Sequence, residues 1–193
     1  MYVAIEGIDT AGKSTQIEAL RSIFPDALIT KEPGGTPAGI EIRAMVLHGN
    51  LKSKTAELLL FLADRAEHTE AVILPNMNKL IISDRSAVSG MAYASVQNLC
   101  DESTLVMLNR LATNGTLPDT VFILKLTPDE LAHRLNQKEH DVIESRGIDY
   151  LLSIQESLIA SAYALGIQTH VIDATQSIDT ITNEITSLIK GAL

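Results

Sequence analysis

Cysteine is nearly absent from this chain of 193 residues, since Cys100 is the only one and no disulfide can form within the chain. Long hydrophobic runs are also missing. The longest covers residues 58–63, whereas a membrane-spanning helix needs about 20 apolar residues. With neither a cysteine framework nor an N-terminal signal segment, the sequence predicts a cytoplasmic protein with no membrane partner.

Positive charge is scarce as well, because Lys and Arg total 15 against 24 Asp and Glu, for a formal net charge of -9. Nucleic acids and anionic membranes favour a basic face, so no nucleic-acid partner is expected. A small anionic ligand is compatible with this balance, because a few arginines can reverse the sign of the charge in one pocket. The sequence also lacks the N-K-x-D segment that a guanine-reading switch protein requires.

The sequence does contain apolar segments typical of strands, which alternate regularly with segments of helical periodicity. Continuous apolar segments, typical of strands buried on both faces of a parallel sheet, predict strands over 2–6, 27–30, 79–83, 120–126 and 169–173. Helices are expected over 12–23, 55–72, 101–112, 128–137, 148–165 and 178–189. The alternation predicts an α/β fold, with a five-stranded parallel sheet flanked by helices in one domain over 1–193. The polar segment 136–147 breaks the pattern and is expected to form a short lid.

A phosphate-binding motif follows the first expected strand, where the stretch IEGIDTAGKSTQ (5–16) has the spacing G-x-x-x-x-G-K-[ST]. In such a P-loop the backbone N–H groups bind phosphate, the lysine reaches the β- and γ-phosphates, and the serine binds Mg²⁺. A chance match is the alternative, which the strand before and the helix after the motif disfavour. We therefore expect a P-loop NTPase fold whose ATP-binding residues are Gly7, Ile8, Asp9, Thr10, Ala11, Gly12, Lys13, Ser14 and Thr15.

A second candidate element is LIISDR (80–85), where Asp84 follows a buried strand and could hold Mg²⁺ together with Ser14. A helix cap is the alternative role for Asp84. Arg85 beside a metal carboxylate indicates a second anionic group, and Arg43 and Arg65 could join it around a second phosphate. Taken singly, each arginine could equally be a solvated surface residue or an ion-pair partner.

Several longer stretches extend these motifs, namely EGIDTAGKST (6–15), TKEPGGTPAGIEIR (30–43), LLFLADRAEH (59–68), DRSAVSGMAY (84–93) and VIDATQSID (171–179). On these stretches, spread over the whole chain in family order, the sequence resembles the thymidylate kinase family of P-loop nucleoside monophosphate kinases. The resemblance implies transfer of the γ-phosphate of Mg-ATP to dTMP, which gives dTDP and ADP in dTTP biosynthesis. It also implies that Lys13, Asp84, Arg85 and Arg134 carry the catalysis.

The resemblance also implies how dTMP is held. Phe61 and Arg65, one turn apart on a helix, would stack on the thymine ring and donate to its O4, which rejects cytosine because cytosine carries a donor there. On periodicity alone, core packing is the better reading for Phe61. The full set of implied substrate-binding residues is Asp9 (to the 3′-OH), Glu32, Arg43 and Arg85 (to the phosphate), Phe61, Arg65, Ser89 and Tyr93 (beside the sugar 2′ position).

The chain departs from the family at Thr10, where some members carry a catalytic arginine. Members without that arginine usually supply the charge from the lid, for which the candidates here are Arg134, Lys138 and Arg146. Adenine is expected near 173–175.

Alternatives stay open on the sequence alone: a kinase for another nucleoside monophosphate, a P-loop switch, or a non-catalytic nucleotide-binding module. The segments 55–72 and 86–99 could form a homodimer face, as in the family, or pack within the chain.

Overall fold

The strands form where apolar residues follow one another without polar interruption. The computed structural model describes residues 1–49, 51–136 and 147–193, which contain one sheet of five parallel strands in the order β2-β3-β1-β4-β5. The strands are β1 (Tyr2–Glu6), β2 (Leu28–Lys31), β3 (Ile81–Asp84), β4 (Thr120–Lys125) and β5 (Gln168–Asp173). The predicted sheet is confirmed, and every strand lies within two residues of its expected range.

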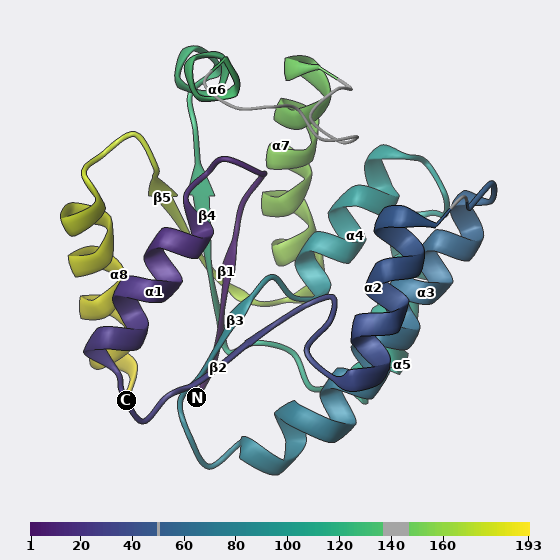
Figure 1. The fold of residues 1–193 in the computed structure, drawn as a ribbon, viewed down its shortest axis with the longest axis horizontal. Helices are drawn as coiled ribbons and strands as arrows, with labels where there is room; N and C mark the ends of the chain where they lie inside the picture. The colour runs from purple at the N-terminus through teal and green to yellow at the C-terminus, as the bar shows by residue number, and fades with distance from the viewer. Residues whose placement is uncertain (50, 137–146) are drawn as a thin grey trace.

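Helices cover both faces of this sheet (Figure 1). They are α1 (Lys13–Ile23), α2 (Pro37–His48), α3 (Lys54–His68), α4 (Ala87–Val96), α5 (Glu102–Ala112), α6 (Pro128–Leu135), α7 (Ile148–Leu165) and α8 (Ile178–Ala192). Helices α1 and α8 pack together on one face, while α4, α5 and α7 pack against one another on the other, with α2 and α3 paired beside them. No helix within the described ranges is long and apolar enough to cross a bilayer.

Two helices escaped the sequence prediction, because their apolar periodicity is weak. Helix α2 begins inside the Gly/Pro-rich stretch KEPGGTPAG (31–39). Its N-cap Thr36 accepts a hydrogen bond from the Gly39 N–H, and Pro37 occupies the first turn. Helix α4 begins after Ser86, whose hydroxyl accepts from the Val88 N–H. The N-cap signals were therefore present in the sequence.

The helix expected over 55–72 also differs, because α3 ends at His68 and continues as the π-helical turn η1 (Thr69–Ile73) and the 3₁₀ turn η2 (Leu74–Asn76). Pro75, which has no N–H to donate, prevents the regular helix from continuing.

Since all five strands are parallel, their carboxyl ends meet at one edge of the sheet, and the loops that follow them meet there too. Figure 1 shows α6 above this edge, next to the loop between β1 and α1. The expected lid falls almost entirely on residues 137–146, outside the described residues, together with Lys138 and Arg146.

Candidate active site

The loop between β1 and α1 has the backbone that a phosphate cradle requires. Gly7 and Gly12 have φ of 150° and 95°, in a region that side chains disfavour. A Cβ on Gly7 would lie 3.0 Å from the Leu124 carbonyl oxygen, so a larger residue does not fit there. Thr10 also adopts a positive φ, of 69°, a conformation with a steric cost for a residue with a Cβ. The N-terminus of α1 follows at once, with its N–H groups directed at the loop.

Lys13 lies under this loop and is buried, with its Nζ donating to the Ile8 carbonyl oxygen at 2.9 Å. The same Nζ lies 3.7 Å from Asp9 Oδ1. Burial lowers the pKa of Lys13 to about 8, and the nearby Arg85 charge adds to this effect. The loop thus holds one partly desolvated cation beside the space for a phosphate.

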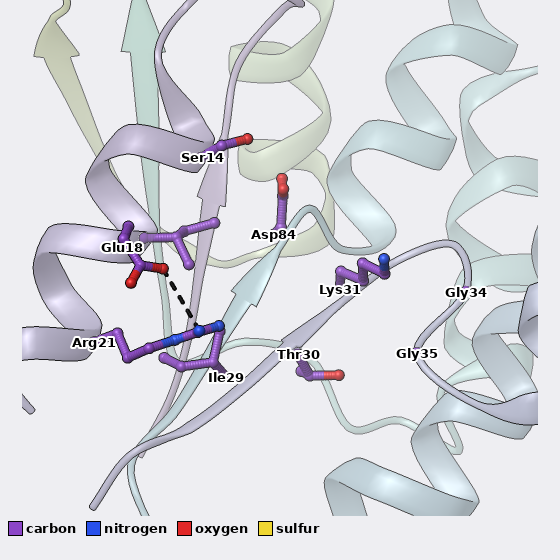
Figure 2. Close-up of a pocket in the computed structure, with 10 residues that line it drawn as sticks. Ser14, Glu18, Arg21, Ile29, Thr30, Lys31, Gly34, Gly35 and Asp84 are labelled. Carbon is purple, nitrogen blue, oxygen red and sulfur yellow. Dashed lines mark ion pairs between the residues drawn. The ribbon is translucent and has the colours of Figure 1, made fainter. Parts of the chain in front are cut away.

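Ser14 and Asp84 lie at one end of a groove of about 430 Å³ between α1 and β2 (Figure 2). At the other end the groove passes the Glu18–Arg21 ion pair on α1. Asp84 Oδ1 is buried without a hydrogen-bond partner among the described residues. Oxygen ligands from a hydroxyl and a carboxylate fit Mg²⁺, so an unsatisfied carboxylate oxygen beside Ser14 suits the expected metal.

Arg85 is held in a left-handed conformation, with φ of 70°, that a residue other than glycine rarely adopts. Two hydrogen bonds fix this backbone: the Arg85 N–H donates to Ile5 O at 3.1 Å, and Ser83 Oγ donates to Arg85 O at 2.7 Å. The side chain turns towards the cradle, where its Nη2 lies 2.6 Å from Asp9 Oδ1 and its Nη1 donates to Gly7 O at 3.1 Å. The strain therefore aims one arginine at the phosphate loop.

Glu6, which the sequence analysis did not single out, connects the cradle with α4. It is fully buried, accepts from Ser86 Oγ at 2.7 Å and from Ser89 Oγ at 2.5 Å, and burial raises its pKa. Ser89 Oγ in turn accepts from Arg85 Nη1 at 3.1 Å. An acid at the end of an apolar strand was the signal that could have identified it, because a buried carboxylate needs partners.

The Tyr93 hydroxyl is a second buried oxygen without a partner among the described residues. The Tyr93 ring lies 6.0 Å from the Arg85 guanidinium carbon, and burial raises its pKa to about 12. An unpaired hydroxyl beside a cation is suited to a polar ligand.

Arg65 on α3 is buried within a network of polar side chains from four parts of the chain. Its Nε donates to Glu32 Oε2 at 2.9 Å, and its Nη1 donates to Asn109 Oδ1 at 2.9 Å. The other Glu32 oxygen lies 3.0 Å from His68 Nδ1, and His68 Nε2 lies 2.6 Å from Thr30 Oγ1. The prediction placed Glu32 and Arg65 in the site but missed His68 and Asn109, whose partners are distant in sequence.

Phe61 and Arg43, two further residues predicted to bind the substrate, lie outside this network. Phe61, one turn before Arg65, is half-buried, and it belongs to neither of the buried apolar clusters found in the described residues. Arg43 on α2 donates from Nη1 to Pro33 O at 3.0 Å and is only partly buried. Phe61 therefore does not have the packing of a core residue, which leaves its ring available for a flat ligand.

Arg134 on α6 reaches the cradle from the opposite side. Its Nη1 donates to Thr10 O at 3.1 Å and its Nη2 donates to Ala174 O at 2.7 Å, while Glu130 fixes its Nε at 2.6 Å. Next to Ala174, the Thr175 N–H and hydroxyl both donate to Asp173, in the stretch expected to lie near adenine. One guanidinium thus joins the cradle to the loop after β5.

Lys13 of the P-loop and Arg85 both contact the Asp9 carboxylate. Asp84, at the end of β3, offers a carboxylate oxygen suited to a metal ion. Together these features define the class of P-loop phosphotransferases. A sequence profile of the thymidylate kinase family matches residues 5–185. The thymidylate kinase of Sulfurimonas denitrificans is 60% identical over 190 residues, which cover 98% of this chain and 100% of the relative. That of Wolinella succinogenes is 54% identical over 193 residues, covering 99% and 100%.

A solved structure agrees with these sequence relatives. The thymidylate kinase from Ehrlichia chaffeensis superposes with a TM-score of 0.77 at 26% identity, and the match covers 98% of each chain. The chain belongs to the thymidylate kinase family, as its motifs predicted.

Proposed function

We propose that this chain transfers the γ-phosphate of Mg-ATP to dTMP and so produces dTDP and ADP. The observation that carries the proposal is the position of Asp9, whose Oδ1 lies 3.7 Å from Lys13 Nζ and 2.6 Å from Arg85 Nη2. Lys13 belongs to the P-loop between β1 and α1, and Arg85 directly follows β3. Because both cations contact one side chain, a donor phosphate held by Lys13 and an acceptor phosphate held by Arg85 would lie close to each other, as phosphoryl transfer requires.

On the donor side, we propose that the backbone of residues 7–15 binds the ATP phosphates and that Lys13 neutralises charge on the transferred group. Ser14 and Asp84 would hold the magnesium ion, whose role is to neutralise charge on the β- and γ-phosphates. The buried, unpaired Asp84 Oδ1 supports this assignment.

Arg134 would supply the cation that Thr10 does not. Its Nη1 lies 3.1 Å from the Thr10 carbonyl oxygen, and this contact with the cradle supports the assignment. The other two candidates that the sequence offered, Lys138 and Arg146, lie outside the described residues.

On the acceptor side, we propose that Arg85 and Arg43 bind the dTMP phosphate and that Asp9 takes the sugar 3′-OH. Ser89 would hold the Arg85 side chain through its hydroxyl, at 3.1 Å from Nη1. Tyr93 would pack beside the deoxyribose, and its unpaired buried hydroxyl supports contact with a polar ligand group.

The thymine ring would stack on Phe61, and Arg65, fixed by Glu32, would donate to its O4. Specificity then follows from polarity, because cytosine would bring an amino group against an arginine that can only donate.

We further propose a cytoplasmic homodimer. Helix α4, part of one expected interface segment, packs within the chain and buries most of its residues. Exposed large apolar side chains remain on α2, α3 and α5, namely Ile40, Met45, Leu47, Leu59, Met107 and Leu111. Since α2 packs against α3 and α3 against α5, these helices could supply one apolar interface. Sedimentation of the purified chain should show a dimer, and a monomer at micromolar concentration would contradict it.

The function is tested by coupling ADP release to an absorbance assay with Mg-ATP and a set of acceptors. We expect turnover with dTMP and far less with CMP, GMP or UMP, and Arg65→Ala should weaken dTMP binding more than ATP binding. Equal rates with all acceptors would favour a general nucleoside monophosphate kinase. ATP hydrolysis without any acceptor requirement would contradict the proposal.

A further inference from the structure

The Arg65 guanidinium makes three hydrogen bonds within the protein, apart from any bond to a bound base. Of its five N–H donors, three are used: Nε by Glu32, Nη1 by Asn109 and Nη2 by the Ser86 carbonyl oxygen at 3.3 Å. One N–H therefore remains on each terminal nitrogen. The positions of these two N–H groups depend on the plane in which the guanidinium is held.

Asn109 on α5 is built to receive this guanidinium. It is fully buried, and its Nδ2 donates to the Leu105 carbonyl oxygen at 2.8 Å, which turns Oδ1 towards Arg65. An amide in a buried helix face is costly unless both ends are paired, and here the second partner is Arg65 Nη1 at 2.9 Å. None of the family-like stretches found in the sequence includes Asn109.

The opposite side of the guanidinium lies against the backbone of α4. A Cβ on Gly90 would approach Arg65 Nη2 to 2.7 Å and Nη1 to 2.9 Å. Glu32 holds Nε, and the Ser86 carbonyl oxygen holds Nη2 only through a longer bond of 3.3 Å. The turning of the planar guanidinium is therefore limited mainly by Gly90 on one side and by the 2.9 Å hydrogen bond to Asn109. Without Asn109, Nη1 would have no acceptor and the plane could tilt away from α5.

We infer that Asn109 is a positioning residue that sets the plane of Arg65 and thereby the selection of an acceptor base with a carbonyl over one with an amino group. This inference rests on the proposed function, in which Arg65 donates to thymine O4. A guanidinium with a fixed plane cannot turn its donors aside for an amino group, so dTMP is favoured over dCMP. Loss of Asn109 should weaken dTMP binding and the discrimination together.

The test compares Asn109→Leu, which keeps the branched shape of the side chain but removes both its acceptor and its donor, with Asn109→Asp, which keeps the acceptor oxygen. An exposed asparagine on α8, Asn183→Leu, serves as the matched control. For Asn109→Leu we expect the KM for dTMP to rise about tenfold or more, since Arg65 Nη1 loses the acceptor that fixes the plane of the donors facing the base. The ratio of kcat/KM for dTMP over dCMP should fall, while kcat and the KM for ATP stay within about twofold. Asn109→Asp should restore the dTMP values.

A purely structural role would lower the melting temperature of Asn109→Leu and leave the dTMP-to-dCMP ratio unchanged, which would overturn the inference. Equal rises in KM for dTMP and ATP would also overturn it. If Asn109→Leu does not fold, Asn109→Ala gives the same measurement without added methyl groups. A wild-type chain that fails to use dTMP would overturn the proposed function first, whereas normal wild-type turnover with unaltered variants would overturn the inference alone.

Discussion

Replacing Glu32 by glutamine removes one charge from a buried ion pair while keeping the shape of the side chain. The Glu32 and Arg65 side chains are 5% and 4% exposed, so the arginine would be left as an uncompensated charge away from water. Burial on its own raises the pKa of Glu32, but the Arg65 charge and the hydrogen bond from His68 outweigh it and lower that pKa. Glu32 is therefore ionised in the folded protein.

The loss of stability in Glu32→Gln depends on which hydrogen bonds of the network can still form. An ionised Glu32 only accepts, so His68 carries a proton on Nδ1, and a neutral ring then accepts from Thr30 at Nε2. In Glu32→Gln the amide oxygen can accept from Arg65, and the amide nitrogen can donate to His68 Nδ1. The His68 ring then carries its proton on Nε2 and donates it to Thr30. All hydrogen bonds are then kept and only the charge is lost. We therefore expect the lower end of the cost of breaking a buried pair, about 3 kcal/mol.

Thermal and urea unfolding measure this loss. For a chain of this size, about 3 kcal/mol corresponds to a fall in melting temperature of roughly 6–12 °C. Glu18→Gln is the matched control, because Glu18 is 70% exposed and its contact with Arg21 is 3.5 Å long, so its removal should change little. An unchanged or raised melting temperature for Glu32→Gln would refute the reasoning.

The pH dependence gives a second test of the same reasoning. Because the pKa of Glu32 is lowered by folding, its contribution is full above the ordinary glutamate pKa of about 4.3 and is lost as the pH falls through the lowered value. The gap between wild type and Glu32→Gln should therefore be constant near neutral pH and close in acid. A gap that widens as the pH falls would contradict the assignment of an ionised Glu32.

Two further predictions concern the cradle and the base pocket. Because the pKa of Lys13 is about 8, ATP affinity measured by calorimetry should fall as the pH rises through that value and Lys13 loses its charge; a flat profile up to pH 9.5 would argue against it. Gly90→Ala should raise the KM for dTMP and destabilise the fold by about 1–3 kcal/mol, because its Cβ meets the Arg65 guanidinium. Gly191→Ala, where a Cβ meets nothing within 4 Å, should be neutral or stabilising, and similar effects from both substitutions would contradict this account.

The parts of the fold and site that the sequence predicted are those encoded by neighbouring residues. The apolar run of β1, the glycines of the cradle and the position of Asp84 at a strand end each depend on a few consecutive residues. Helix α4 was missed because Gly90 and a mainly apolar composition hide its periodicity, although Ser86 provides an N-cap.

The buried network around Arg65 could not be predicted in the same way. Arg65 and Asn109 are 44 positions apart, and they meet only because α3 packs against α5. Glu6 and Ser89 are 83 positions apart, and they meet only where α4 lies beside the end of β1. A buried acid or amide in an apolar element signals that a partner exists, but it does not identify which residue that partner is.

Arg134 carries its charge on α6 rather than on the cradle, and on our proposal this affects how the enzyme protects ATP. On that proposal, the guanidinium would stand beside the phosphates only while it contacts the carbonyl oxygens of Thr10 and Ala174. Any displacement of α6 would remove a catalytic charge from bound ATP, and water would then attack the γ-phosphate without its help. An arginine within the loop itself would assist water at all times. The placement on α6 would thus favour transfer to the acceptor over hydrolysis of ATP.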